Sequence, residues 1–187
     1  MIQPADDAQL VRRVADGDEG ALRTLFARHQ TPVYRFILRL VRNEAVAEEL
    51  TNEVFLEVWR NAGSFEARSS VRTWVLSIAH HRAVSSLRKR REEGWNEDRA
   101  FTIADTDDDP EVSAQKQDKS TLMRRCMGAL SNEHRQVIDL VYYQELSINE
   151  VSKVVGIPEN TVKTRMFYAR KRLSELLIEA GVDRGWP

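Results

Sequence analysis

Apolar residues recur along most of the chain at the spacing of an amphipathic α-helix, and the alternation typical of strands is rare. Capping residues and helix breakers divide this pattern into successive segments. In the N-terminal half, the expected helix starts are Asp7 or Ala8, Asp18, Thr31-Pro32, Asn43 and Ser69 or Ser70. The pattern therefore predicts an all-α fold made of two small helical domains.

The clearest local pattern lies between residues 146 and 173. Gly156 can adopt the left-handed conformation that ends a helix, Pro158 cannot continue one, and Glu159 or Asn160 can start the next. The helix before this turn has its apolar spacing at Ile148, Val151 and Val154-Val155. The helix after it has an apolar stripe at Val162, Met166, Ala169 and Leu173. Its other faces are strongly basic, so the segment predicts a helix-turn-helix whose second helix enters the major groove of DNA.

Composition and length narrow the class of protein. The chain has 187 residues, of which 42% are hydrophobic, enough for the core of one or two domains. It has no apolar run near twenty residues and no signal-peptide pattern, and its lone Cys126 cannot form an internal disulfide. Cys126 is expected to be a buried small residue rather than a redox sensor. We therefore expect a cytoplasmic protein without membrane insertion.

The formal net charge of −1 hides a strong asymmetry along the chain. Residues 71–91 carry six basic side chains and no acid, residues 92–118 carry a net charge of −8, and residues 119–187 carry +3. The acidic stretch lacks apolar periodicity and is expected to be a flexible linker. We expect a domain at residues 8–92, the linker at 93–118 and a second domain at 119–180.

Three segments in this order, residues 47–59, 69–90 and 146–165, resemble the extracytoplasmic-function (ECF) sigma factors, the minimal two-domain group of bacterial RNA polymerase sigma subunits. The resemblance covers about residues 8–92 and 120–178. It implies a region-2-type domain, a region-4-type domain, and a role in promoter-specific initiation of transcription. The implied partners are core RNA polymerase (the β′ clamp helices and the β flap), promoter DNA and an anti-sigma factor that keeps the protein inactive until a stress signal. It implies no cofactor, no metal and no catalytic residue.

In the first segment the family has an acidic helix that docks on the polymerase clamp. By resemblance, the core-polymerase-binding residues are Glu48, Glu49, Asn52, Glu53, Phe55, Leu56 and Trp59. The chain departs from the family at Glu49, where Asp is more usual, and at Asn52, where Gln is more usual. Both changes keep the polar character of the helix.

The second segment is similar to the helix that melts and reads the promoter −10 element. The residues implied are Ser64, Phe65, Arg68, Ser69, Arg72, His80, His81, Arg82 and Arg88. His80 and His81 stand where Arg-Asn is common in the family, which alters the expected −10 preference. Trp74 is expected to be a core residue rather than a stacking platform for a base.

The third segment is similar to the reader of the −35 element. The residues implied are Asn160, Thr161, Lys163, Thr164, Arg165, Tyr168 and Arg172. Asn160 replaces the usual Gly, and both residues are tolerated at a helix start. Arg165 could pair with guanine in a bidentate contact, whereas Arg172 is expected to meet phosphates or solvent.

Two other classes of function compete with this interpretation. A stand-alone helix-turn-helix regulator, with residues 1–92 as a sensor or dimerisation domain, would share the third segment but not the first two. An enzyme is disfavoured because the sequence has no phosphate-binding loop, zinc signature or carboxylate–histidine constellation. Because the net charge is near zero, we expect weak promoter binding by the free chain.

Overall fold

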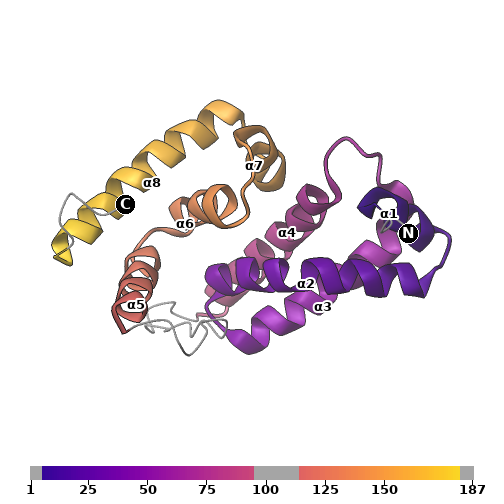
Figure 1. Ribbon diagram of the computed structural model, residues 1–187, viewed down its shortest axis with the longest axis horizontal. Coiled ribbons are helices and arrows are strands. Elements are labelled where there is room, and N and C mark those ends of the chain that lie inside the picture. The colour runs from indigo at the N-terminus through magenta and orange to yellow at the C-terminus, as the bar shows by residue number, and fades with distance from the viewer. Residues whose placement is uncertain (1–5, 95–113, 182–187) are drawn as a thin grey trace.

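The computed structural model describes residues 6–94 and 114–181, and this part of the chain is helical, as predicted. The elements are α1 (Asp7–Ala15), α2 (Glu19–Val41), α3 (Glu44–Asn61), the 3₁₀ turn η1 (Ala62–Ser64), α4 (Val71–Glu92), α5 (Ala114–Gly128), α6 (Asn132–Ile138), the π-helical turn η2 (Asp139–Tyr143), α7 (Ile148–Val155) and α8 (Glu159–Glu179). We refer to α1–α4 as the N-terminal module and to α5–α8 as the C-terminal module. Figure 1 shows the two modules side by side, with α6 and α7 facing α2 and α4.

The N-terminal module is a bundle in which α2, α3 and α4 pack around one apolar core. Phe36 and Leu76 lie fully inside it, and the rings of Phe26 and Phe55 meet edge to face with centroids 4.8 Å apart. Along each helix the apolar spacing seen in the sequence faces inward. This packing fixes the outer faces of α3 and α4 relative to each other.

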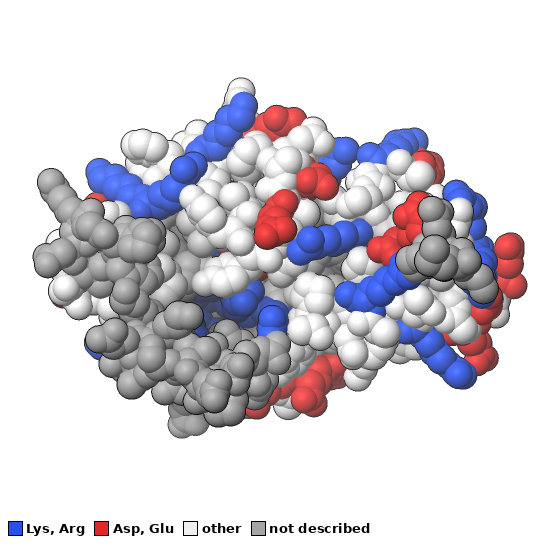
Figure 2. All heavy atoms as spheres, in the orientation of Figure 1, with Lys and Arg blue, Asp and Glu red and all other residues white. Residues whose placement is uncertain are grey.

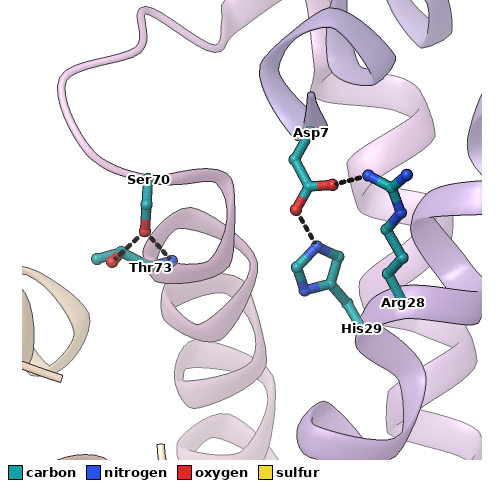
Figure 3. Close-up of polar contacts among 5 residues, drawn as sticks. All are labelled: Asp7, Arg28, His29, Ser70 and Thr73. Atoms are coloured by element: carbon teal, nitrogen blue, oxygen red, sulfur yellow. Dashed lines mark hydrogen bonds and ion pairs between the residues drawn. The ribbon is translucent and has the colours of Figure 1, made fainter. Parts of the chain in front are cut away.

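Side-chain caps start the helices where the sequence predicted them. Asp18 accepts a hydrogen bond from the backbone N–H of Ala21 at 3.0 Å, and Asn43 accepts one from Val46 at 3.0 Å. Ser70 likewise accepts from the N–H of Thr73 at 3.1 Å, as Figure 3 shows. Each cap satisfies one amide that would otherwise lack a partner in the first turn.

The predicted helix start at Thr31-Pro32 is wrong. Helix α2 runs without interruption from Glu19 to Val41, with Pro32 inside it. Pro32 has no N–H to donate to the carbonyl of Arg28, but the apolar face continues through Leu25 and Val33 into the core. Burial of this continuous face outweighs the local preference of proline for a first turn.

Asp7 ties the first helix to the second, as Figure 3 shows. Its carboxylate accepts from Arg28 at 2.6 Å and lies 2.7 Å from Nε2 of His29. Burial alone would raise the pKa of Asp7, but the hydrogen bonds from Arg28 and His29 outweigh it and lower that pKa. This cluster anchors α1 over α2 at the far end of the module from the C-terminal module.

In the C-terminal module, Arg135 on α6 organises the turn that follows α5. Its buried guanidinium donates to the carbonyls of Met127, Gly128 and Leu130 at 3.0, 3.1 and 2.7 Å. Cys126, just before this turn, is buried, and burial raises the pKa of its thiol, which fits the packing role expected from the sequence.

Helix α5 starts at Ala114, inside the segment 93–118 that was expected to be a linker. The rest of that linker after Gly94, including the acidic run Asp105–Pro110, lies outside the described residues, as does the tail containing Trp186. The boundaries of the two domains therefore stay a prediction.

Candidate nucleic-acid interface

The acidic helix α3 presents a narrow outer surface. Glu48, Glu49, Asn52 and Leu56 are exposed, and Leu56 keeps 54% of its surface accessible although it is apolar. The other residues of the expected polymerase-binding set point elsewhere. Phe55 is buried against Phe26, Trp59 is half-buried, and Glu53 turns toward α4, as does Glu57, which was not in the expected set.

Arg82 joins α4 to α3. Its guanidinium lies 2.6 Å from Glu57 and 3.3 Å from Glu53, and the hydrogen bond to Glu57 is the largest contribution to the raised pKa of Arg82. All three side chains keep 30–40% of their surface exposed, so the cluster faces solvent at its edge. Arg82, expected at the −10 element, thus pairs with two residues of the helix expected to bind polymerase.

The loop before α4 is short and folded onto the helix. The ring of Phe65 packs on Trp74 with centroids 5.0 Å apart, which leaves Trp74 half-buried, a packing rather than a solvent-facing position. Ser64 is exposed and donates to the carbonyl of Asn61 at 2.8 Å. Arg68 is exposed and pairs with Glu66 at 2.5 Å, and Ser69 is half-buried.

The residues expected to read the −10 element on α4 fall into two groups. His81 and Arg88 are exposed, whereas Arg72 and His80 face the C-terminal module. His80 is 8% exposed, and this burial lowers its pKa despite an opposing hydrogen bond with Gln136 of α6. Burial therefore favours the uncharged form of His80.

The predicted helix-turn-helix is present, with α7 and α8 joined by a tight turn. Gly156 has φ +69°, the left-handed conformation that its position after α7 requires. The start of α7 carries a capping box that the sequence analysis missed: Ser147 accepts from the N–H of Glu150, and the Glu150 carboxylate accepts from the N–H of Ser147 at 3.0 Å. Its signature, Ser followed three residues later by Glu, was readable in the sequence.

Helix α8 carries an exposed basic face on the outer side of the C-terminal module. Figure 2 shows Lys and Arg side chains gathered along the outer edge of the molecule over α8. Six of the residues expected at the −35 element are exposed: Asn160, Thr161, Lys163, Thr164, Tyr168 and Arg172. Arg165 is half-buried and pairs with Glu133 of α6 at 3.3 Å, and Arg172 pairs with Glu175 at 3.1 Å.

Phe167 also lies on this face and was not among the expected residues. It is the most exposed large apolar side chain of the described chain, at 64%, and its ring contacts that of Tyr168 edge to face. The sequence carried a readable sign of this, because Phe167 falls outside the apolar stripe of α8, next to Met166. Together with Tyr168, Phe167 adds exposed aromatic surface to the basic face of α8.

Within residues 6–94 and 114–181, no three His, Cys, Asp or Glu side chains gather in a way that could hold a metal ion. None of the helices described there combines the length and apolarity that a membrane span needs.

Comparisons with known proteins agree with the division into two modules. Residues 25–93 match the family model of sigma-70 region 2, and residues 126–175 match that of sigma-70 region 4. The chain is 35% identical over 172 residues to the ECF RNA polymerase sigma factor SigK of Mycobacterium bovis, covering 90% of this chain and 91% of the relative. It is 34% identical over 160 residues to SigK of Mycobacterium sp. strain KMS, covering 84% and 83% of the two chains.

Two solved structures share the fold. The sigma factor RpoE of Bartonella quintana, in complex with the anti-sigma factor NepR, superposes with a TM-score of 0.70 at 23% identity, covering 87% of this chain and 98% of that one. CnrH, in complex with the cytosolic domain of CnrY, superposes with a TM-score of 0.69 at 22% identity, covering 92% and 97%.

Proposed function

The chain belongs to the ECF RNA polymerase sigma factors, alternative sigma factors that direct transcription initiation, and from this premise we propose which of its surfaces does what. The N-terminal module docks on core polymerase through α3 and engages the −10 element through α4. The C-terminal module binds the −35 element through α8. The observation that carries this proposal is that the outer faces of α3 and α8 are exposed and of opposite charge.

The exposed surface of α3 suits a basic partner with an apolar socket. Glu48, Glu49 and Asn52 supply charge and hydrogen-bond acceptors, and Leu56 supplies the apolar contact one to two turns further along. An exposed apolar residue beside acidic ones is a typical anchor within a polar rim. The β′ clamp helices of core polymerase are the proposed partner, and the β flap is the proposed contact of the C-terminal module.

For the −10 element, Ser64, Arg68, His81 and Arg88 are the proposed contacts available on the surface. A base taken out of the duplex costs a few kcal/mol, so it needs stacking and edge hydrogen bonds in exchange. Arg72, His80 and Arg82 join this set only when their present partners release them.

On α8, Asn160, Lys163 and Thr164 are the proposed readers of base edges in the major groove, because they lie in the first turns of the recognition helix. Phe167 extends this surface with an apolar contact of the kind that a thymine methyl accepts. Arg172, further along the helix, suits a phosphate contact that sets position rather than sequence.

An anti-sigma factor is the proposed regulatory partner, acting inside the cytoplasm where the polymerase works. Support comes from the family and from the two similar structures, which are complexes of sigma factors: RpoE with the anti-sigma factor NepR, and CnrH with the cytosolic domain of CnrY. A stress signal that releases the anti-sigma factor completes the proposal.

Run-off transcription with bacterial core polymerase on a genomic promoter library tests the function. We expect start sites that depend on the chain and share two short upstream elements at fixed spacing. The Glu49→Lys variant should lose both core binding and these starts, since it reverses a charge on the exposed face of α3. The matched control is Glu19→Lys, at an exposed glutamate on α2 away from that face, which should retain both. Core binding by Glu49→Lys at the level of the control would contradict the proposed docking surface.

A further inference from the structure

Helices α3 and α4 carry the two surfaces of the N-terminal module that are proposed to bind polymerase and the −10 element. They pack directly against each other, and Val58 of α3 and Ala83 of α4 have no exposed surface. The neighbouring charged residues, Glu57 and Arg82, meet at the edge of this contact, where both are partly exposed. The edge along which α3 and α4 meet is therefore charged.

Arg82 of α4 bridges two glutamates that lie about one turn apart on α3. Its Nε donates to Glu57 at 2.8 Å, and its Nη2 lies 2.6 Å from the same carboxylate oxygen. Its Nη1 donates to Glu53 at 3.3 Å. We refer to these three side chains as the Arg82 bridge. Because the guanidinium is a planar fork with several donors, one side chain of α4 holds two successive turns of α3.

The Arg82 bridge lies between the two exposed surfaces. On α3, the exposed residues Asn52 and Leu56 stand immediately before the two glutamates of the bridge. On α4, the exposed His81 stands immediately before Arg82. The bridge therefore joins the side of the module proposed to bind polymerase to the side proposed to bind DNA.

The charge of the Arg82 bridge does not suit a direct contact with DNA. One guanidinium and two carboxylates give it a net charge of −1, which repels a phosphate rather than attracting it. All three guanidinium nitrogens of Arg82 already lie against the carboxylates. To bind a phosphate, Arg82 would have to leave both partners, and two neighbouring negative charges would remain on α3.

We propose that Arg82 is a positioning residue for promoter opening, which acts through Glu53 and Glu57 to hold the DNA-binding face of α4 at a fixed orientation to α3. Once α3 is docked on polymerase, the bridge sets where His81 and the rest of that face meet the −10 strand. Binding groups work best when supporting contacts hold them within about 0.5 Å of the productive geometry. In this role the two glutamates do not release Arg82, which touches no base or phosphate. The inference rests on the proposed roles of α3 and α4.

A charge swap separates positioning from direct contact. In the Arg82→Glu variant three carboxylates meet at one edge, and the attraction between the helices becomes a repulsion. Adding Glu57→Arg restores an opposite-charge pair and the net charge of the wild type. The swap should rescue a positioning residue. It cannot rescue a phosphate contact, because position 82 stays negative.

The measurement is the rate at which preformed holoenzyme opens the −10 element, read as permanganate oxidation of unpaired thymines on a promoter found by run-off transcription. Arg82→Glu should slow opening by about fivefold, the upper end for a partly exposed ion pair, and the double variant should recover most of that loss. Arg82→Lys keeps the charge but should also slow opening, because an ammonium group lacks the fork that bonds both carboxylates.

Two comparisons make the same change of charge elsewhere. Arg23→Glu reverses one partner of an exposed pair with Glu19 on α2 and should leave the opening rate unchanged. Arg88→Glu reverses an exposed side chain that is proposed to contact DNA. It should slow opening, and adding Glu57→Arg should not rescue it.

A role of Arg82 in stability alone is separated by two further measurements on Arg82→Glu and on the double variant. Binding to core polymerase, and binding of the holoenzyme to a −35 duplex, should stay near the wild-type level. Circular dichroism should show intact helices. If the substitution merely unfolded the N-terminal module, core binding and promoter opening would fall together.

The proposal would be overturned by wild-type opening in Arg82→Glu or Arg82→Lys, by a double variant as slow as Arg82→Glu, or by core binding that falls in parallel with opening. A wild-type chain that opens no promoter with core polymerase would instead contradict the proposed function, and this inference with it. The two failures are distinguishable because the second appears before any residue is substituted.

Discussion

Helices α4 and α8 are both basic and both proposed to read DNA, but their proposed DNA-binding faces differ in exposure. The reading face of α8 looks outward, with Lys163, Thr164 and Phe167 exposed. The corresponding face of α4 is partly covered, with His80 buried and Arg72 bonded to Gln144. The face of α8 is thus open to a duplex, whereas part of the face of α4 is in contact with the C-terminal module.

The largest expected effect concerns the ion pair between Arg39 of α2 and Asp139 of η2, which joins the two modules. Arg39→Gln should lower the free energy of unfolding by about 3–5 kcal/mol, because it leaves the buried Asp139 carboxylate without its partner. Adding Asp139→Asn should recover most of that loss, since the uncompensated charge is then gone. Urea denaturation of the wild type, both single variants and the double variant measures the coupling. Additive effects of the two substitutions would show that Arg39 and Asp139 do not stabilise each other.

The contact between the modules should also make the free energy of unfolding depend on pH, through Asp139. Burial raises the pKa of Asp139 to about 6, above its ordinary value of 3.8, although Arg39 and Gln144 act in the opposite direction. The packed state therefore binds this proton more tightly, so the stability that Asp139 contributes is present at low pH and is lost as the pH rises from about 4 to 6.

We expect the unfolding free energy of the wild type, relative to Asp139→Asn, to fall by roughly 1–3 kcal/mol over that range and to be flat above it. His80 has a lowered pKa and titrates in the opposite sense, but it is present in both proteins and cancels in the difference. Denaturation series at pH 4 to 7.5 give the comparison. A difference that rises with pH would contradict the raised pKa that burial gives Asp139.

The exposed residues of α8 should fall into two groups, those that read bases and those that contact phosphates. Lys163→Ala should cost about 1–3 kcal/mol of binding to the correct −35 duplex and relax the preference for one base pair. Arg172→Ala should weaken all duplexes about equally and reduce the salt dependence, because Arg172 suits phosphate contacts and already pairs with Glu175. Fluorescence anisotropy with polymerase holoenzyme at several salt concentrations measures both. Equal loss on all sequences for both variants would remove the assignment of Lys163 to base readout.

The smallest expected effect concerns Ser147, the N-cap of α7. Its partner Glu150 also contacts Thr73 of α4. Ser147→Ala removes the side chain that accepts from Glu150 N–H and should destabilise the helix-turn-helix by about 1 kcal/mol. Ser131→Ala removes the equivalent cap of α6 and should lower the stability by a similar amount, so it serves as the matched comparison. Thermal unfolding measures both, and an exposed serine such as Ser85 gives the baseline. A Ser147→Ala protein as stable as the Ser85→Ala protein would argue against the capping box.

The features that the sequence predicted well are those decided within a few residues. The caps at Asp18, Asn43 and Ser70 depend on one side chain and a backbone amide three residues away. Gly156 ends α7 because its own conformation is left-handed. Exposure of most −35 residues followed from the apolar stripe of α8.

The features that the sequence did not predict are decided by distant contacts. Pro32 stays inside α2 because the helix face before and after it is buried by other elements. His80 is hydrogen-bonded to Gln136, and Asp139 is hydrogen-bonded to Arg39, 100 residues away. The sequence did not indicate that His80 would be buried beside an exposed His81, because His80 contacts a residue of α6, far away in the sequence.

The most direct test of the account measures the distance between the modules by fluorescence energy transfer. Labels at Ser85→Cys on α4 and Ser174→Cys on α8, both exposed positions, report it in a Cys126→Ser background. The account predicts high transfer in the free chain and a marked fall when core polymerase and a promoter bind, because the two modules must then reach elements at least one DNA turn, ~34–36 Å, apart. Low transfer in the free chain, or the same transfer with and without polymerase and promoter, would contradict it.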